Sequence, residues 1–379
     1  MSDKAYLTYY RKHGIVPVRQ DTADLMLHLS RRRSLYRHLG IQPLTLRNRR
    51  ILEFGPGTGD NALYIASCSP ELCVLVDGNP ASIQAISDKF DRGSLPREYF
   101  ECHMSEIREY TDARRFDVVL CEGVVPGQDT PATFLAQVAS FAGNDGIVVI
   151  TTLSAPSILA EVCRRVIKAV FETTFHVRED LVNELTRFFE PDLNSLPGMS
   201  RRPDDWVLDN ILHPWPARIT FTIPEAIDSL EPDFDLLGTS PCFIQDWRWY
   251  KAIPGNNQTW NDVARKEYHR WAPFLLDYRV HPGDSIPSIT KELDDACEAA
   301  LKVHHEIWHH SAVNEIPRFT DCLREIHNMI AGLLPRAAEA ITDFLEGLKQ
   351  LSDGNPDADF ASFRTWFGRG QQYVSFTRK

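Results

Sequence analysis

Two acidic residues stand at the ends of two consecutive apolar runs, with a glycine-rich segment between them. Glu53 lies in the first run, residues 50–54, and the second run, residues 72–76, leads directly into Asp77. Three glycines at alternate positions follow the first run: Gly55, Gly57 and Gly59. Glycine tolerates positive φ and leaves the backbone bare, so a ligand can lie directly against this segment.

The two acids indicate the kind of ligand. Asp77 comes eighteen residues after Gly59, and a carboxylate at the tip of a neighbouring strand is positioned to hold the two hydroxyls of a ribose. Glu53 would meet a positively charged group. An adenosine with a cationic amino-acid tail satisfies both acids, and S-adenosylmethionine is such a ligand. The alternative is a glycine-rich turn without a ligand, which two acids at this spacing disfavour.

Residues 50–80 resemble the cofactor-binding region of the class I (Rossmann-like) methyltransferases. The dinucleotide fingerprint needs its third glycine one position later, where this chain has Asp60. This spacing, together with Glu53, favours S-adenosylmethionine over a nicotinamide or flavin cofactor. The resemblance implies an α/β fold built on a doubly wound, mainly parallel sheet of seven strands.

The resemblance also implies roles around the cofactor. The three glycines would line its methionine part, with Glu53 reaching the ammonium group through water and Asp77 binding the ribose. Further expected cofactor contacts are Gly78, Asn79, His103, Met104 and Cys121. His103 stands where many relatives have an aspartate that bonds the adenine amine. It stacks on or bonds the adenine, or it is an ordinary loop histidine and the acidic role has passed to Glu106.

Two residues are the leading candidates for catalysis. Glu122 directly follows an apolar run, residues 116–121, and the carboxyl ends of parallel strands face the ligand crevice. We expect it to contact the substrate, to act as a general base, or to offset the charge of the sulfonium. His213 is the second candidate, with a packed loop histidine as the alternative. Further candidates are Tyr9, Tyr10, His13 and Trp215.

One motif suggests a different chemistry. Residues 305–309 read His-Glu-Ile-Trp-His, the HExxH pattern of zinc proteases, which places two histidines on one helical face. No third ligand follows at the usual distance, and His304 and His310 make a chance match easy. We therefore predict no catalytic metal here.

Composition narrows the function classes. The chain has 379 residues, of which 43% are hydrophobic and 25% charged, as in an ordinary soluble protein of more than one minimal domain. The net charge of −11 argues against nucleic acid as a partner. The arginine clusters 31–33 and 201–202 are predicted to be solvated helix faces or anion contacts. The eight cysteines show no paired CxxC spacing, which indicates buried thiols in a reducing compartment.

The first residues lack the apolar segment of a signal peptide, and no apolar stretch reaches the length of a membrane span. These observations predict a cytoplasmic protein without a membrane partner, and the methyltransferase resemblance is interpreted as implying a small-molecule acceptor.

The hydrophobic pattern alternates strands and helices through the middle of the chain. A helix with leucines at helical spacing is expected over residues 21–39. Strands are expected at 50–54, 72–76, 99–102, 116–121, 146–152 and 234–237, and helices at 60–67, 79–90, 131–141, 156–190 and 223–230. The alternating tail is predicted to be a seventh, antiparallel strand between strands five and six.

These elements predict a core interrupted by insertions, which cover the crevice or form the surface of a homodimer. The expected segments are an N-terminal helical cap (1–45), the cofactor-binding core (46–155), a helical and irregular substrate insertion (156–222), a continuation of the core (223–253), a helical insertion (254–366) and the final core strand (367–379).

Three segments resemble a bacterial methyltransferase group associated with surface-polysaccharide gene clusters: residues 9–18, Cys121-Glu122-Gly123, and residues 368–373. The resemblance implies a sugar or nucleotide-sugar hydroxyl as acceptor. Four tryptophans in the insertions suit sugar stacking or belong to the core: Trp206, Trp215, Trp247 and Trp249. The alternatives are a protein or nucleic-acid acceptor, and a non-catalytic scaffold that binds S-adenosylmethionine.

Overall fold

The computed structural model describes residues 8–10, 12, 19–199, 201–253, 258–282, 289–310, 312–355 and 357–379. The chain divides into two compact units. The first unit comprises residues 1–153, 218–268 and 371–379, and the second comprises residues 154–217 and 269–370. Within the described ranges, no helix combines the length and the apolar composition needed to cross a membrane.

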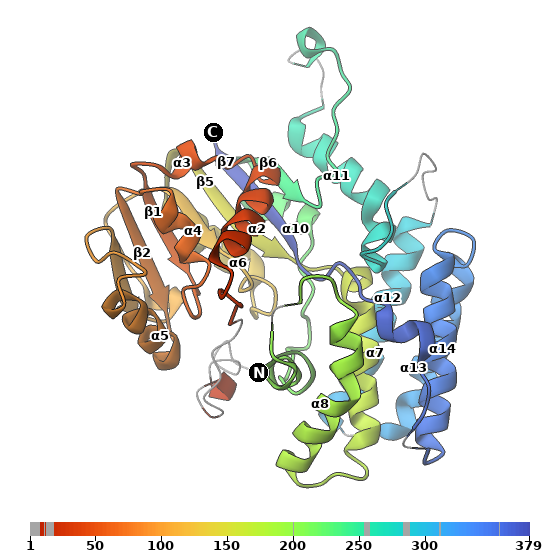
Figure 1. Ribbon diagram of the computed structural model, residues 1–379. Coiled ribbons are helices and arrows are strands. Elements are labelled where there is room, and N and C mark those ends of the chain that lie inside the picture. Colours follow the sequence, from red (N-terminus) through yellow and green to blue (C-terminus); the bar gives the residue numbers. More distant parts are fainter. Residues whose placement is uncertain are drawn as a thin grey trace. The chain divides into compact units, whose positions relative to one another are not determined.

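The first unit is built on a seven-stranded mixed sheet (Figure 1). Its strands are β1 (Arg50–Phe54), β2 (Leu72–Asp77), β3 (Phe100–Met104), β4 (Phe116–Cys121), β5 (Ala142–Thr152), β6 (Phe234–Ser240) and β7 (Gln372–Arg378). The strand order is β3-β2-β1-β4-β5-β7-β6. The first five strands pair in parallel, and β7 pairs antiparallel with both β5 and β6. The expected seventh strand between strands five and six is therefore confirmed.

Strand β5 begins four residues earlier than the sequence predicted. Its pairing with β4 starts at Phe116 and Ala142, and the register shifts before Val118 pairs with Ile147. Asp145 lies inside the strand at a φ of 57°. The segment 143–146 reads as a turn in the sequence, but the neighbouring strand holds it in the sheet as an irregularity.

The α-helices that belong wholly or mostly to the first unit include α2 (Leu25–His38), α3 (Pro43–Leu46), α4 (Ala62–Ser67), α5 (Pro80–Asp91), α6 (Pro131–Ala139), α10 (Ile223–Leu230) and α11 (Trp260–Trp271). Helix α5 begins as its sequence predicts. The Asn79 side chain accepts a hydrogen bond from the Ala81 N–H at 3.1 Å, and Pro80 occupies the first helical position.

The buried face of α2 is polar rather than leucine-rich. Its buried residues are His28, Arg32 and Tyr36, spaced four apart, whereas Leu25 and Leu27 are exposed. The helix packs beside a polar site. There a hydrogen-bonded histidine and an arginine with a carboxylate partner are better satisfied than leucines.

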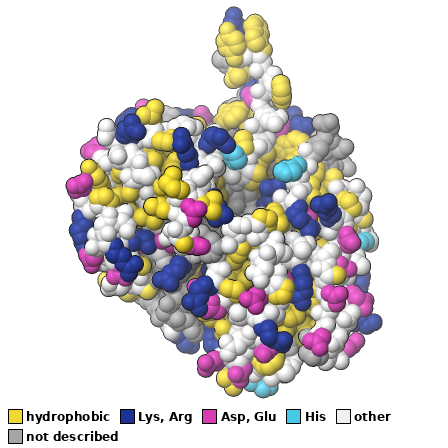
Figure 2. Space-filling model, in the orientation of Figure 1, with side chains coloured by type: hydrophobic (Ala, Val, Ile, Leu, Met, Phe, Trp, Pro, Cys, Tyr) yellow, Lys and Arg dark blue, Asp and Glu magenta, His cyan; other side chains and the backbone are white. Residues whose placement is uncertain are grey.

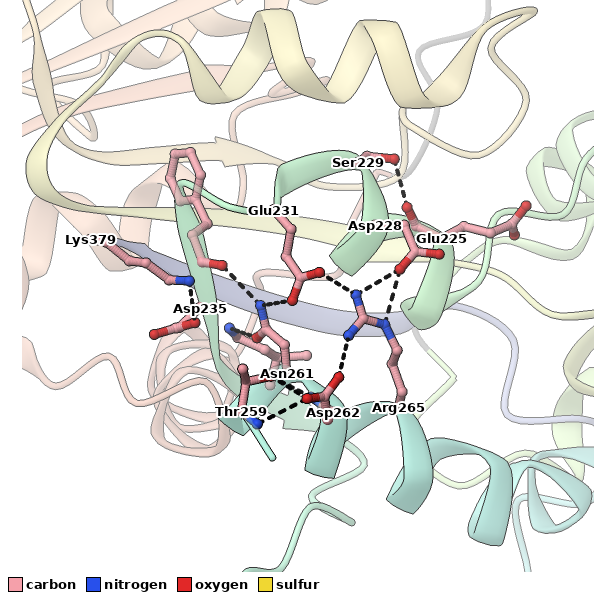
Figure 3. Close-up of polar contacts among 12 residues, drawn as sticks. Glu225, Asp228, Ser229, Glu231, Asp235, Thr259, Asn261, Asp262, Arg265 and Lys379 are labelled. Atoms are coloured by element: carbon pink, nitrogen blue, oxygen red, sulfur yellow. Dashed lines mark hydrogen bonds and ion pairs between the residues drawn. The ribbon is translucent and has the colours of Figure 1, made fainter. Parts of the chain in front are cut away.

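Helix α11 is fixed to the sheet and to α10 by polar contacts (Figure 3). The Asn261 amide accepts a hydrogen bond from the Leu236 N–H at 2.9 Å and donates to the Phe234 carbonyl at 3.0 Å. Arg265 forms ion pairs of 2.7 Å with Asp228 and 2.6 Å with Glu231. Helix α11 therefore packs with the core, although its residues were expected in the insertion 254–366.

The second unit is helical in its described part. Its longer helices are α7 (Ala155–Phe171), α8 (Arg178–Asn194), α12 (Thr290–His310), α13 (Ile316–Ile330) and α14 (Pro335–Ser352). The helix expected over 156–190 is two helices, and α8 continues through Pro191. The segment expected to be irregular also contains α9 (Pro203–Trp206) and a π-helical turn, Val207–Ile211.

A fully buried arginine organises the second unit. The Arg164 guanidinium pairs with Asp192 at 3.0 Å. It also donates to four backbone carbonyls, those of Ala160, Phe363, Arg364 and Trp366. Every N–H of this guanidinium thus has an acceptor, which makes its burial tolerable.

Candidate functional site

The glycine turn after β1 has the backbone conformation that the sequence predicted. Gly55, Gly57 and Gly59 have φ values of 67°, 57° and 74°, which residues with a Cβ rarely adopt. A Cβ on Gly55 would also approach the Cγ2 of Val124 to 2.8 Å. The segment is therefore restricted to glycine at this point, and it presents bare backbone at the carboxyl end of β1.

Asp77 ends β2 beside this turn and is nearly buried. Its carboxylate accepts hydrogen bonds from the backbone N–H of Asn79 at 2.8 Å and of Gly57 at 3.2 Å. Burial raises the pKa of Asp77, and these two N–H groups and the Ser82 hydroxyl oppose the shift. Each carboxylate oxygen keeps a second lone pair, which a ligand hydroxyl could use.

Glu53 is the least satisfied acid of the site. It is 4% exposed, and its Oε2 has no hydrogen-bond partner within the part of the chain that the structure describes. Burial, together with the nearby Glu122 and Asp77, raises its pKa to about 8 against the opposing effect of Arg32. A buried oxygen without a partner is costly. The position therefore suits a cationic ligand group, and the ammonium group of S-adenosylmethionine fits it.

Asp60, at the position where a dinucleotide site has its third glycine, fixes the loop. Its carboxylate accepts from the Gln20 N–H at 2.9 Å and the Thr58 hydroxyl at 2.5 Å, and it pairs with Lys89 at 2.8 Å. The Asp60 carbonyl bonds the His28 ring at 2.9 Å. Asp60, which replaces the third glycine of the dinucleotide fingerprint, thus connects α2 and α5 to the glycine turn.

Glu122 follows β4 and is bound by an arginine from α2. The Arg32 Nη2 donates to both carboxylate oxygens, at 2.8 and 2.9 Å, and the Tyr36 hydroxyl donates to Oε1 at 3.2 Å. Arg32 also donates to the Tyr36 hydroxyl at 2.7 Å. Desolvation opposes the charge of Arg32, but Glu122 and Tyr36 outweigh it, so the pKa of Arg32 is raised.

Two segments far apart in the sequence meet beside Glu122. A Cβ on Gly123, whose φ is 76°, would lie 3.7 Å from the Gln371 side chain, and the Gly123 N–H donates to the Thr151 hydroxyl at 2.7 Å. Tyr373 on β7 has its pKa raised to about 12 by burial and by Glu122, while a hydrogen bond with Arg32 opposes the shift. The segments Cys121-Glu122-Gly123 and 368–373 thus contribute residues to one neighbourhood.

The other expected cofactor contacts lie at the same edge of the sheet. His103 and Met104 end β3, where Met104 pairs with Asp77. Both side chains are exposed, and His103 lies 3.3 Å from Glu101 and edge-on to the Tyr110 ring. Cys121 is buried at the end of β4, and burial raises the pKa of its thiol. Gly78 and the helix-capping Asn79 are both buried beside Asp77.

His213 belongs to the second unit, and Glu122 belongs to the first. Burial, together with the nearby Arg165, lowers the pKa of His213 to about 4 against the opposing effect of Asp209. Its backbone carbonyl accepts a hydrogen bond of 2.8 Å from Arg165. The Arg165 guanidinium lies between two indoles, 4.0 Å from the Trp215 ring centre and 3.9 Å from that of Trp308.

The HExxH segment lies on α12. The rings of His305 and His309 are 4.1 Å apart between centres, and His309 contacts the Trp215 carbonyl at 3.2 Å. Glu306 pairs with Arg318 at 2.7 Å. Among the residues that the structure describes, no group of three or more His, Cys, Asp or Glu is arranged to hold a metal ion.

Sequence reasoning missed the residues that surround the acids. Arg32 and Tyr36 belong to the site, and a signal for Arg32 was present, because the arginine run 31–33 was expected to be a solvated helix face or an anion contact. Arg31 and Arg33 are exposed, in agreement with a solvated helix face. His13 lies outside the described residues, so its expected role has no structural counterpart here.

Comparison with known proteins assigns part of the chain. A family model described as a methyltransferase domain matches residues 28–190, slightly less than half of the chain. No curated protein matches.

Several solved structures are similar at low sequence identity. PKMT2 from Rickettsia typhi, in complex with AdoHcy, is 16% identical with a TM-score of 0.46, over 65% of this chain and 50% of that one. Coclaurine N-methyltransferase, bound to N-methylheliamine and SAH, is 12% identical with a TM-score of 0.39, over 96% of this chain and 76% of that one. The N-methyltransferase NodS from Bradyrhizobium japonicum is 16% identical with a TM-score of 0.32, over 39% and 74%. The chain spans about half the length of the Rickettsia protein.

The domain match covers β1 to β5 and the glycine turn, and the two acids fit the expected ligand. The chain therefore carries a methyltransferase domain, and S-adenosylmethionine is its cofactor.

Proposed function

We propose that this enzyme transfers the methyl group of S-adenosylmethionine to a small-molecule acceptor, and that a sugar or nucleotide-sugar hydroxyl is that acceptor. The observation that supports the methyl-transfer site is the pair of buried acids at the ends of adjacent parallel strands, Glu53 and Asp77, one of which has an oxygen without a partner. The acceptor class rests on the sequence resemblance alone.

In this proposal the first unit binds and orients the cofactor, which supplies an activated methyl group. Asp77 binds the ribose hydroxyls, and the glycine turn lies against the methionine part. Glu53 receives the ammonium group, which gives its orphaned oxygen a charged partner. His103 and Met104 border the adenine from the end of β3, and Cys121 closes the pocket floor at the end of β4.

Glu122 is assigned an electrostatic role rather than that of a base. Both of its carboxylate oxygens already accept hydrogen bonds from Arg32, so a proton from the acceptor would compete with a guanidinium. A carboxylate held in this way offsets positive charge beside Glu53 without moving a proton.

His213 remains the candidate base for a hydroxyl acceptor. Its low pKa keeps the imidazole neutral near pH 7, the form that accepts a proton, although an imidazole with so low a pKa is a weak base. The variant His213→Gln tests the role, since loss of turnover with unchanged cofactor affinity is expected for a base.

The primary test is calorimetric titration of S-adenosylmethionine into the protein and into Asp77→Ala. We expect micromolar binding that weakens about 100-fold in the variant, because two hydrogen bonds to a charged group are lost. Asp91→Ala is the matched control, because Asp91 is exposed and pairs only with Arg97. Transfer of a labelled methyl group to sugars, nucleotide sugars and proteins then identifies the acceptor.

Each outcome separates the alternatives. Equal binding by the protein and Asp77→Ala would contradict the assigned ribose contact. Binding without transfer to any acceptor would favour the non-catalytic scaffold, and transfer only to protein would replace the proposed acceptor class. A cytoplasmic location is part of the proposal, supported by free cysteines such as the buried Cys73, Cys121 and Cys163.

A further inference from the structure

An exposed aromatic segment stands between β6 and α11 in the first unit. Trp247, Trp249 and Tyr250 are 91%, 66% and 68% exposed, and Ile253 is also exposed. We call residues 245–253 the aromatic projection. Figure 1 shows the chain extending away from the start of α11 here, and Figure 2 shows hydrophobic side chains gathered along it. Trp247 and Trp249 are thus not core residues, whereas Trp206 is buried.

The projection is held in shape by its own polar groups. The Arg248 guanidinium binds both oxygens of Asp246, at 2.6 to 3.0 Å, and donates to the Gln258 carbonyl across the segment at 3.0 Å. The Arg248 N–H also donates to Asp246 at 2.9 Å. These bonds pair the acid with the arginine and join the two sides of the segment.

The base of the projection is equally well anchored. After the projection, the chain enters α11, which is fixed to β6 through Asn261 and to α10 through Arg265 (Figure 3). Before the projection, at the end of β6, the Thr239 hydroxyl donates to the Pro241 carbonyl at 2.8 Å. The exposed rings are therefore presented by a defined structure.

The ring geometry does not suit a sugar platform. Trp249 and Tyr250 are 6.1 Å apart between ring centres, with an angle of 75° between their planes, so they do not form one flat surface. Lys251 lies 5.4 Å from the Trp249 ring centre and 5.7 Å from that of Tyr250. No carboxylate among the described residues pairs with this lysine.

We propose that the aromatic projection is a docking surface for the interfacial region of a phospholipid membrane. Tryptophan and tyrosine prefer this region because their rings are apolar and their N–H or O–H groups stay hydrated. A neighbouring lysine reaches the phosphate groups while its stem lies against apolar surface. The only acid of the projection, Asp246, is neutralised by Arg248, so the exposed end carries a local positive charge in a chain of net charge −11.

This docking is peripheral, and it does not depend on the identity of the methyl acceptor. The expectation of no membrane partner rested on the lack of a spanning segment, which has no bearing on a surface contact of this kind.

The test is co-sedimentation of the full-length protein with large unilamellar vesicles. One vesicle type is pure phosphatidylcholine, and the other also contains phosphatidylglycerol, roughly 30% of the lipid, as the anionic component. We expect binding to both, stronger with the anionic lipid. Replacing Trp247, Trp249 and Tyr250 by alanine should lower the partition constant about tenfold or more. Lys251→Ala should lower it about fivefold on anionic vesicles and hardly at all on neutral ones.

The matched control is Met26→Ala with Leu44→Ala, two exposed apolar residues elsewhere in the first unit, which should leave vesicle binding unchanged. Cofactor affinity should be the same in every variant, which shows that the variants are folded. The proposal is overturned if the unmodified protein binds neither vesicle type, or if the control lowers binding as much as the triple variant. It is also overturned if the projection instead mediates self-association, seen in sedimentation velocity without lipid and lost in the triple variant.

Discussion

Two buried arginines show how differently the two units use charge. Arg164 in the second unit directs all of its N–H groups at acceptors, one carboxylate and four carbonyls. Arg32 in the first unit binds Glu122 and Tyr36, but its Nε has no hydrogen-bond partner within the described ranges. The adjacent Glu53 also keeps an orphaned oxygen.

The difference separates a structural charge from a binding charge. A closed network, such as that of Arg164, stabilises one conformation and has nothing left to offer a ligand. An incomplete network costs free energy in the folded protein, and a ligand that completes it recovers that cost. The cluster of Arg32, Glu53 and Glu122 is of the second kind, and it lies where the cofactor is expected.

The largest effect is expected from breaking the closed network. Arg164→Ala leaves the buried Asp192 carboxylate with Arg364 as its one remaining partner among the described residues. It also removes donors from four carbonyls, so the free energy of unfolding should fall by about 3–5 kcal/mol. Urea unfolding measures this, and cofactor affinity below the transition should be unchanged. Arg187→Ala, an exposed pair with Glu184, should cost less than about 0.5 kcal/mol. Equal stability of the Arg164 and Arg187 variants would contradict the structural role.

A smaller loss of stability is expected at the incomplete network. Arg32→Ala should lower the free energy of unfolding by about 2–3 kcal/mol, because among the described residues the Glu122 carboxylate then keeps one hydrogen-bond donor, the Tyr36 hydroxyl. It should also raise the pKa of Glu53 further, since Arg32 lowers that pKa.

The double variant Arg32→Met with Glu122→Leu should recover most of the stability, because an apolar pair removes the buried charges. It should not recover the cofactor affinity, because the charged groups beside the expected cofactor are gone. Arg33→Ala on the exposed side of α2 is the control. Full cofactor affinity in the double variant would show that the cluster is structural, like that of Arg164.

The smallest effect concerns the proton on Glu53. Because burial raises its pKa to about 8, the folded protein without cofactor binds more protons than the unfolded chain between the ordinary pKa of 4.5 and about 8. Glu53 therefore makes the free energy of unfolding fall as pH rises through that window. A cationic ligand favours the ionised carboxylate, so cofactor binding should release a proton and tighten as pH rises from 6 toward about 8.

Glu53→Gln should weaken cofactor binding about tenfold near pH 8 and remove most of this pH dependence. Calorimetry in buffers of different ionisation enthalpy counts the released proton directly. An unchanged proton count in Glu53→Gln would show that another group titrates, and the ammonium contact would then have to be reassigned.

The cofactor side of this site was predictable from sequence because it depends on local chemistry. The glycine turn requires positive φ, and the acids Glu53 and Asp77 stand at fixed positions on consecutive strands. The antiparallel seventh strand was also predictable, from the alternation of residues 372–378 and the place left for it in the sheet.

The partners of the acids were not predictable in the same way. Arg32 meets Glu122 across 90 residues of chain. Tryptophans such as Trp247 and Trp249 are usually core residues, and only the folded structure shows that their segment projects into solvent. Such contacts depend on packing between distant elements, which residue spacing does not encode.

The position of β7 has a consequence for how the molecule can be divided. The strand closes against β5 across 220 residues of sequence, at Thr152 and Gln372, and the chain passes between the two units at four places. Such long-range pairing predicts slow folding, because the entropy of closing large loops is lost before the sheet is complete. It also means that no single cut yields either unit as a continuous fragment. An engineer who wants the cofactor-binding unit alone would have to rejoin three separate segments, with new linkers in place of both stretches of the helical unit.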